Sequence, residues 1–413
     1  MEEKVRFVLE YEQDEHTMTE LCQSYGIARE TGYVWLRRYR ERGVEGLVEV
    51  NRAALRHGNQ TPAETEQAVL ELRQAHMRWG PRKLKRVLER DQAHRSWPAA
   101  STIGELLKRE GLVVGRKKRR RTAAYTEPLA HADGANRVWC ADFKGWFRTG
   151  DGERIDPLTI SDGYSRYLLR CQAVEKTDTE RAKAIFEAAF REYGMPAAIR
   201  TDNGAPFAST AVGGLSRLAV WWMKLGIVPE RIQAGHPEQN GRHERMHRTL
   251  KQETAQPAAA NRRAQQRAFD RFRQEYNQQR PHEALGMQTP AAVYAPSPRA
   301  YPARVPEPEY PATMLVRSVH HQGQIRWKKH DVVLTHVLWG ERVGLLPVDE
   351  RWFTIYFTQF ALARFDSYKL RIMPLPKEEG FDIAEAGEGE ASPSPAPHPF
   401  MEAEKKVSGM CPV

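Results

Sequence analysis

The sequence predicts a multidomain protein with all-α modules at the N-terminus, an α/β domain with a mixed sheet in the middle and a small β-barrel near the C-terminus. Apolar residues recur at helical spacing up to about residue 115, and strand-like runs separated by turns begin at about residue 136. Short alternating strands return after residue 312. The length of 413 residues allows about three domains, and 40% of the residues are apolar, which suffices for ordinary cores.

The charge balance favours a polyanionic partner, most often nucleic acid. The chain carries a formal net charge of +10 and has a pI of about 9.4. Its four cysteines lie far apart and form no Cys-x-x-Cys pair, which argues against a disulfide framework and a cysteine-based zinc site and fits a reducing cytoplasm. No apolar run approaches the length of a membrane-spanning helix and the N-terminus is acidic, so we expect no membrane partner.

Residues 1–55 are expected to form a helix-turn-helix DNA-binding domain. A short helix capped by Thr19, a turn at Gly26 and a basic helix occur in the order that defines this motif. The side chains of the basic helix that we expect to contact DNA are Arg29, Thr31, Tyr33, Arg37 and Arg38. The alternative is an αα-hairpin whose arginines form a solvated face.

Residues 56–115 are expected to form a second helical, helix-turn-helix-like DNA-binding domain. One helix begins at Thr61-Pro62, a second follows Gly80-Pro81, and a third ends at Gly111. The expected DNA contacts of this domain are Arg82, Lys83 and Lys85, and those of a basic linker at 116–132 are Arg116, Lys117, Lys118, Arg119, Arg120 and Arg121. Each basic side chain near a phosphate would release counterions, although a solvated linker is the simpler alternative.

Residues 133–295 are expected to form the α/β domain. Three strand-like runs are followed by a capped helix at 177–194, a strand that ends at Asp202, a helix at 208–225 and a further strand. Two more helices are expected at about 238–256 and 259–280. The rest of the chain is expected to comprise a proline-rich linker at 296–312, the small β-barrel at 313–375 and a disordered acidic tail at 376–413.

Three acidic residues are candidate metal ligands. Asp142 lies in the first strand among aromatic residues that are expected to pack, Trp146 included, and an unpaired carboxylate there would be costly to bury. Asp202 directly follows a strand, and Glu244 falls near the start of a helix. Mg²⁺ prefers oxygen ligands, and two ions about 4 Å apart can flank a scissile phosphate, so these three carboxylates could hold such ions. Asp202 could instead be a simple turn residue, because Asp-Asn-Gly is ordinary turn chemistry.

Five short motifs follow one another between about residues 130 and 295. They are Trp139-x-x-Asp142-Phe143-Lys144-Gly145, Ser161-Asp162-x-Tyr164-Ser165-Arg166-Tyr167, Thr201-Asp202-Asn203-Gly204, His236-Pro237-x-Gln239-Asn240-Gly241-x-x-Glu244 and Tyr276-Asn277-x-x-Arg280-Pro281-His282-x-x-Leu285. Each motif alone is a weak signal, whereas the five in this order are specific. They resemble the motifs of insertion-sequence transposases with a retroviral-integrase-type catalytic core, the DDE group.

The resemblance implies an RNase H-like core in which Asp142, Asp202 and Glu244 form the catalytic triad and bind Mg²⁺, with Mn²⁺ as a substitute. It implies metal-dependent DNA cleavage at element ends and strand transfer into target DNA. Asn240 and Lys251 are further candidate DNA contacts, and a solvated lysine is an equal alternative for Lys251. Three nearby residues of the motifs have other expected roles. Glu238 precedes Gly241, which favours Glu244 as the triad glutamate. Asp162 is expected at a strand end, and His243 is expected to position DNA or cap the helix.

The implied partners are double-stranded DNA, at the element ends and the target, and further copies of the chain, because two ends must be joined. An ATPase helper protein is another candidate partner. The expected location is the bacterial cytoplasm, at the nucleoid when the chain is bound to DNA. The alternative function is a DNA-binding regulator or target-capture protein with a catalytically silent core, which the intact Asp142, Asp202 and Glu244 disfavour.

Overall fold

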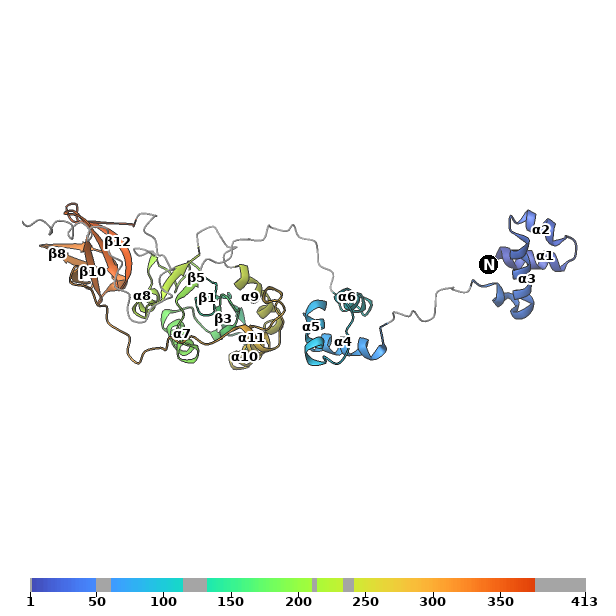
Figure 1. The fold of residues 1–413 in the computed structure, drawn as a ribbon, viewed down its shortest axis with the longest axis horizontal. Coiled ribbons are helices and arrows are strands. Elements are labelled where there is room, and N and C mark those ends of the chain that lie inside the picture. The colour runs from blue at the N-terminus through green and yellow to red at the C-terminus, as the bar shows by residue number, and fades with distance from the viewer. Residues whose placement is uncertain (1, 50–60, 114–131, 210–213, 233–240, 376–413) are drawn as a thin grey trace, which may run out of the picture. The chain divides into compact units, whose positions relative to one another are not determined.

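The computed structural model describes residues 2–49, 61–113, 132–209, 214–232 and 241–375. The chain divides into two compact units, Met1–Gln67 and Ala68–Val413. Figure 1 gives the labels of the helices and strands. The predicted features that lie outside the described residues include the basic run at 116–121, the motif residues 236–240 with Glu238 and Asn240, and the acidic tail at 376–413.

The first unit has the helix order that the sequence predicts. Its elements are α1 (Glu2–Glu12), α2 (Met18–Ser24), α3 (Arg29–Arg42) and the 3-10 helix η1 (Gly43–Leu47). The predicted cap of α2 is wrong, because Thr17 and not Thr19 is the N-cap. The Thr17 hydroxyl accepts from the backbone N–H of Glu20 and the Glu20 carboxylate accepts from the backbone N–H of Thr17, which together form a capping box. Gly26 has a φ of 64°, as the turn between α2 and α3 requires.

The three helices of this unit meet at Gly32 of α3. A Cβ atom at Gly32 would lie 2.7 Å from the Sγ atom of Cys22 and 2.9 Å from the ring of Phe7. The buried side chains around it, Phe7, Cys22 and Leu36 among them, form one apolar cluster. Glycine at this position therefore permits the close helix packing that holds α3 in place.

The second helical module contains α4 (Ala63–Ala75), α5 (Pro81–Asp91) and α6 (Ala100–Arg109). Gly80 is the N-cap of α5 and Pro81 occupies its first position, where a missing backbone N–H costs nothing. Trp79, Leu84 and Ile103 lie at the centre of the module's apolar cluster. The order of helices matches the sequence prediction.

The α/β domain contains a six-stranded mixed sheet, as predicted. Its strands are β1 (Val138–Phe143), β2 (Phe147–Arg148), β3 (Arg154–Asp162), β4 (Leu168–Val174), β5 (Ala198–Thr201) and β6 (Val228–Arg231). Strands β4, β3 and β1 pair antiparallel, whereas β1, β5 and β6 pair parallel, and β2 extends the sheet beside β3.

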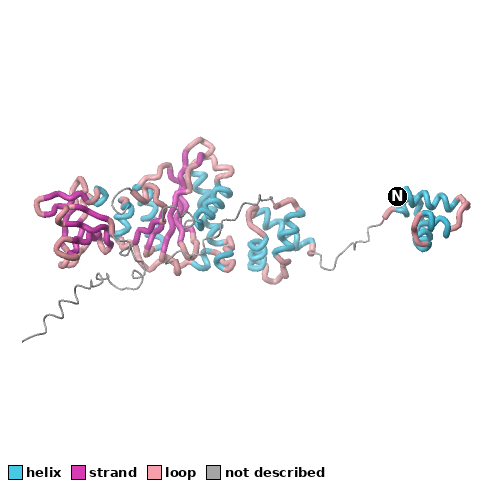
Figure 2. Tube along the Cα trace, turned by 90° about the horizontal axis from the view of Figure 1, so that it is seen from above, coloured by secondary structure: helices cyan, strands magenta, loops and turns pink. Residues whose placement is uncertain are grey.

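Helices cover both faces of this sheet (Figure 2). On one face, α7 (Thr179–Tyr193) and α8 (Arg217–Lys224) bury Trp139, Leu158 and Ile160. On the other face, α9 (Gly241–Thr254) and α10 (Arg262–Gln278) bury Ile155 and Leu168. The short helices η4 (Glu283–Leu285) and α11 (Pro290–Val293) follow. The alternation of side chains along the strands thus fills two separate cores.

Helix α8 is shorter than the helix predicted at 208–225. It begins after Ser216, whose hydroxyl accepts from the backbone N–H of Ala219 at 3.1 Å and donates to the carbonyl of Phe207 at 2.8 Å. This cap stops the helix from extending towards residue 208. Residues 210–213 lie outside the described part of the chain.

The C-terminal region is all-β, but its strand pairing does not form the predicted barrel. The strands are β7 (Leu315–Ser318), β8 (Gln324–Trp327), β9 (His330–Val333), β10 (Arg342–Pro347), β11 (Trp352–Phe357), β12 (Phe360–Asp366) and β13 (Arg371–Met373), with the 3-10 helix η5 (His336–Leu338) after β9. Five of them form an open sheet in the order β13-β12-β11-β10-β7, and β8 pairs with β9 in a separate two-stranded sheet. An isolated bridge between Val319, directly after β7, and Ile325 of β8 links the two sheets. The hairpin also packs on the larger sheet, because the ring of Trp327 lies 4.8 Å from that of Phe353 and 5.2 Å from that of Phe365.

No described helix or strand runs through the proline-rich segment at 296–312, apart from isolated turns, yet the segment is held against the α/β domain. The guanidinium of Arg299 donates to the carbonyls of Pro196, Leu225 and Gly226 at 2.6–3.1 Å. The segment is therefore more than a spacer. Among the described helices, none has the length and apolar character needed to cross a membrane.

Candidate catalytic site

Asp142 and Asp202 lie at the same end of two adjacent parallel strands. The register of β1 and β5 sets Cys140 opposite Arg200 and Ala141 opposite Thr201. Asp142 and Asp202 are the next residues along their chains, and both side chains are half-buried. Because parallel strands run in one direction, their equivalent positions meet at the same edge of the sheet, and the two residues occupy neighbouring backbone positions there.

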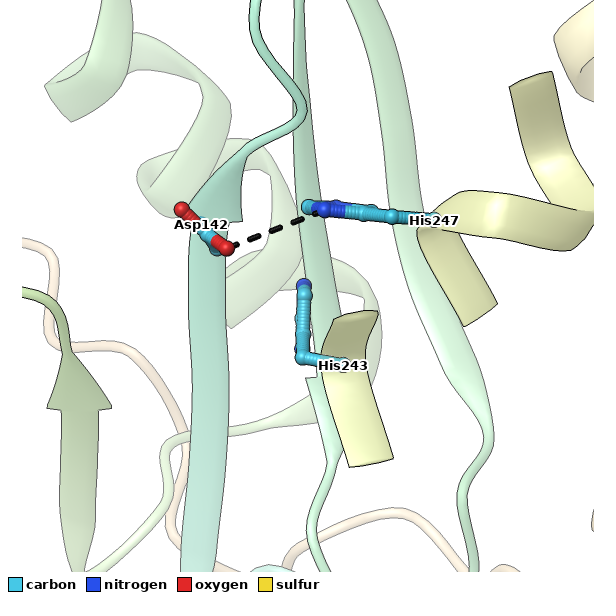
Figure 3. Close-up of side chains that lie close together, drawn as sticks. All are labelled: Asp142, His243 and His247. Carbon is cyan, nitrogen blue, oxygen red and sulfur yellow. Dashed lines mark ion pairs between the residues drawn. The ribbon is translucent and has the colours of Figure 1, made fainter. Parts of the chain in front are cut away.

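Helix α9 carries two histidines towards Asp142. His243 and His247 are four residues apart, so their rings lie on one face of the helix. Both are buried, and the Nδ1 atom of His247 lies 3.7 Å from the Oδ2 atom of Asp142. One potential ligand atom from each of these three side chains lies within 4.8 Å of the others. Figure 3 shows both rings extending from α9 towards the strand that carries Asp142.

Thr159 of β3 connects the two rings. It pairs with Asp142 across the antiparallel strands, and its hydroxyl donates to the backbone carbonyl of Asp142 at 3.2 Å. The same Oγ1 atom lies 2.7 Å from the Nε2 atom of His243 and 2.6 Å from the Nε2 atom of His247. The Nδ1 atom of His243 lies 3.4 Å from the Ser161 hydroxyl. This network fixes the face of α9 that meets the sheet.

Burial keeps both histidines neutral. Desolvation lowers the pKa of His243 to about 4 from an ordinary value of 6.5. Desolvation also lowers the pKa of His247 well below its ordinary value, and the neighbouring His243 and Lys144 act in the same direction. Neutral imidazole is the form that can donate one hydrogen bond and offer one lone pair.

Glu244 is exposed on α9, between the two histidines in sequence. It lies three residues before His247, and helix positions three apart share a face, so Glu244 sits at the open edge of the face that meets Asp142. Among the described residues, the compact group of potential ligands contains Asp142, His243 and His247, without Asp202 or Glu244. The assignment of Asp142, Asp202 and Glu244 as a triad therefore stays a prediction.

The donor set fits a divalent cation. Two half-buried carboxylates at one sheet edge and an exposed carboxylate on the adjoining helix offer the oxygen atoms that Mg²⁺ and Mn²⁺ take. The imidazole of His247 adds a nitrogen atom beside Asp142. Strand β1, the end of β5 and helix α9 thus supply ligands of the right chemistry.

Sequence reasoning missed His247 and misplaced His243. The prediction that His243 positions DNA or caps the helix is wrong, because the side chain is 4% exposed and bonds to Thr159. The available signal was the i, i+4 spacing of two histidines on a predicted helix that also carries Glu244. Asp162, by contrast, ends β3 as predicted and accepts hydrogen bonds from the backbone of Asn136 and from Ser165.

A cavity of about 260 Å³ lies farther along α9. Lys144, Trp146 and Lys251 are among the residues that line it. Trp146 was expected to pack but is 55% exposed, and the guanidinium of Arg154 lies 5.1 Å from its ring. The turn between β1 and β2 lifts this side chain out of the sheet. Exposed Lys251 and Trp146 give the cavity the cationic and aromatic character of a nucleic-acid surface.

The predicted DNA contacts of α3 lie largely on its exposed side. Arg29, Tyr33 and Arg37 are all exposed and recur every four residues, so they share one face of the helix. Arg38 is also exposed, whereas Thr31 is half-buried. The predicted DNA contacts of α5 also differ in exposure: Arg82 is exposed, whereas Lys83 and Lys85 are half-buried.

Family comparisons match most of the described chain. Two models described as integrase core domain match residues 132–237 and 225–290. A model described as helix-turn-helix domain matches residues 3–58, and one described as homeodomain-like domain matches residues 31–107.

The proteins similar to this chain include two from insertion elements. An uncharacterised 31.7 kDa protein of insertion element IS407 from Burkholderia multivorans is 29% identical over 260 residues, which is 62% of this chain and 90% of the relative. An uncharacterised 39.2 kDa protein of insertion element IS476 from Xanthomonas euvesicatoria is 28% identical over 62% of this chain and 72% of the relative. The HTLV-2 integrase catalytic core domain in complex with magnesium, in its trimeric form, is 16% identical, with a TM-score of 0.32 over 39% of this chain and 98% of that chain.

An integrase-type core that follows helix-turn-helix domains defines a protein of the integrase and transposase class that acts on DNA. The mixed sheet, with three antiparallel strands followed by two parallel ones, is the RNase H-like arrangement expected for such a core. Together with the integrase core and helix-turn-helix domains, the similarity to two insertion-element proteins over most of their length supports a DNA transposase of the insertion-sequence type.

Proposed function

We propose that this transposase binds the ends of its element and catalyses metal-dependent DNA cleavage and strand transfer, with Asp142, Asp202 and Glu244 as the ligands of the metal ions. The observation that carries the proposal is the register of β1 with β5, which makes Asp142 and Asp202 neighbours at one sheet edge. Helix α9 meets β1 at this edge and carries Glu244 beside His247. Mg²⁺ is the proposed ion, with Mn²⁺ as a substitute.

The chemistry is phosphoryl transfer without a covalent intermediate on the protein. Divalent ions held by these carboxylates would polarise the scissile phosphate and lower the pKa of the attacking oxygen. In the first step water forms a bond to phosphorus and the element strand leaves with a 3′-hydroxyl. In the second step this 3′ oxygen bonds to a target phosphorus, and the target's 3′ oxygen leaves as a hydroxyl. The carboxylates serve as ligands and not as general bases, while Lys251 and Lys144 contact DNA phosphates near the cavity on α9.

The remaining parts of the chain hold and position DNA. In this proposal the exposed face of α3 reads the element end, and the basic residues of the second module and of the linker at 116–132 contact phosphates. The same proposal includes the domain boundaries expected from the sequence, which fall after residues 55, 115, 132, 295, 312 and 375. The place of action is the bacterial cytoplasm, where the DNA lies.

Two element ends must be joined in one event, so the active form is a DNA-bound oligomer. The proposal needs no ATPase helper, and nothing in the described part of the chain points to one. The C-terminal sheet is proposed to support the core, as argued below, and closure of its strands into a barrel is not needed for that role.

The test is a cleavage and joining assay on DNA that carries the sequences flanking the chain's own gene. Asp142→Asn, Asp202→Asn and Glu244→Gln should each lower joining by at least about a hundredfold, because each removes a ligand that stabilises the transition-state charge. End binding, measured by gel shift, should persist. Glu180→Gln, on the exposed side of α7, is the matched control and should retain joining.

Three outcomes would count against the proposal. Joining at the normal rate by Asp142→Asn would exclude this carboxylate as a ligand. End binding without cleavage by the wild-type protein, in either Mg²⁺ or Mn²⁺, would favour the regulator with a silent core. Cleavage without joining would point to a nuclease.

A further inference from the structure

His247 presents a ring nitrogen to the Asp142 carboxylate inside the site. The Nδ1 atom lies 3.7 Å from Oδ2, and the side chains are only 5% and 15% exposed. Figure 3 marks this contact with a dashed line. The chemical state of that nitrogen follows from the hydrogen bonds made by the rest of the ring.

The hydroxyl of Thr159 decides which ring nitrogens carry protons. A hydroxyl has one proton and two lone pairs. In the arrangement that makes all three contacts hydrogen bonds at once, its proton goes to the backbone carbonyl of Asp142, which can only accept. The Nε2 atoms of His243 and His247, at 2.7 and 2.6 Å, then both donate to the two lone pairs. In this arrangement each ring is the Nε2–H tautomer, and each Nδ1 atom carries a lone pair.

The two Nδ1 lone pairs have different neighbours. That of His243 lies 3.4 Å from Ser161, whose hydroxyl can donate to it. That of His247 faces a carboxylate oxygen, which is a second acceptor. Two acceptors held this close in a buried site repel each other, and a cation between them removes the repulsion.

The spacing suits a shared cation. First-row divalent ions lie about 2.1 Å from nitrogen and oxygen ligands, so two ligands of one ion are about 3.0–4.2 Å apart. The observed 3.7 Å falls in this range. The Nε2–H group of His247 donates to Thr159, which matches the usual pattern of a metal-binding histidine whose other nitrogen is held by a hydrogen bond.

We infer that the Nδ1 atom of His247 is a ligand, beside Asp142, of the divalent ion, which makes the site a mixed nitrogen and oxygen site and raises its affinity for Mn²⁺ relative to Mg²⁺. The inference rests on the proposed function for the role of Asp142. Neutral imidazole favours transition ions over Mg²⁺, which takes oxygen ligands. His243 has both nitrogens engaged and orients Thr159 instead of binding the ion.

The test is electron spin-echo spectroscopy of Mn²⁺ bound to the full chain, which detects coupling of the ion to a ligating ¹⁴N nucleus. The wild-type protein should give imidazole ¹⁴N modulation, and protein grown with ¹⁵N-histidine should give the ¹⁵N pattern instead. His247→Gln, which keeps an oxygen ligand, should lose the modulation and lower the ratio of Mn²⁺ to Mg²⁺ affinity by about tenfold or more. His243→Gln should keep the modulation.

The outcomes separate this inference from the proposed function. In one outcome, the wild-type protein binds Mn²⁺ without ¹⁴N coupling, and Asp142→Asn abolishes the binding. This outcome overturns the inference, while the proposed function stands. Such a result would assign the contact to an ion pair between a doubly protonated His247 and Asp142. Coupling that is lost in His247→Gln, in a protein that neither cleaves nor joins DNA, would support the inference and overturn the function. Failure of Mn²⁺ to bind at all overturns both.

Discussion

The side chains of the candidate site are positioned in two different ways. Asp142 and Asp202 are set beside each other by backbone pairing, which no side chain needs to enforce. His243 and His247 are set by one hydroxyl, that of Thr159. The positions of the two aspartates therefore depend on the sheet, whereas those of the histidines and Glu244 depend on α9.

The buried neutral state of His243 makes the stability of the core depend on pH. Its pKa is about 4 in the folded chain and about 6.5 when unfolded, so between these values only the unfolded chain binds the proton. The contribution of His243 is fully present above pH 6.5 and declines by up to about 3 kcal/mol as pH falls to 4. Urea unfolding at pH 7, 6 and 5 measures this slope, and His243→Gln should have a shallower one. Equal slopes in the two proteins would show that His243 is not the titrating group.

The sequence predicts the places of Asp142 and Asp202 in the fold, because a strand and the residue after it are local patterns. It does not reveal that β1 and β5 are adjacent, since residues 144–197 lie between them and pairing is a property of the whole sheet. His247 escaped notice for a related reason. The position of the His247 ring depends on Thr159, which lies in a strand far away in sequence and belongs to none of the motifs.

Helices and strands illustrate how short-range chemistry sets boundaries. The start of α5 at Pro81 could be predicted because Gly80-Pro81 is itself the signal. The predicted starts of α2 and α8 were misplaced because several serines and threonines lie near the N-terminus of each helix. Which of them is the N-cap depends on its hydrogen-bond partners. Thr17 has Glu20 three residues later, and Ser216 has the Phe207 carbonyl. The open sheet near the C-terminus was read as a barrel because alternating strands look alike in both.

The capping box of α2 gives a test with a matched control. Thr17→Ala removes the hydroxyl that accepts from the backbone N–H of Glu20 and should lower the stability of the first helical unit by about 1 kcal/mol. Thr19→Ala, at an exposed position inside the helix, should change it little. Thermal unfolding followed by circular dichroism on the isolated residues 1–49 and on the full chain compares the two variants. A larger loss for Thr19→Ala would restore the cap that the sequence alone predicted.

Within the second unit, the C-terminal sheet and the core share one apolar cluster. Val220 and Met223 of α8 belong to the same cluster as Leu338, Ile355 and Phe357 of the C-terminal region. Lys224 of α8 forms an ion pair with Glu341 at 3.1 Å. The C-terminal sheet therefore packs against α8, the helix that follows the loop after Asp202 along the chain.

This shared cluster predicts that damage to the C-terminal sheet reaches α8. Leu338 is fully buried in η5, which packs against α8. Leu338→Ala leaves a cavity there and should cost about 2–5 kcal/mol. Hydrogen exchange should speed up in Arg217–Lys224 together with β10, and joining should fall while end binding by the first unit persists. The equivalent truncation Val87→Ala in the second helical module lies in a different cluster and should leave α8 unchanged. If hydrogen exchange in α8 stays at the wild-type rate in Leu338→Ala, α8 and the C-terminal sheet unfold independently. The C-terminal sheet would then serve the transposase in another way, such as contact with DNA or with another copy of the chain.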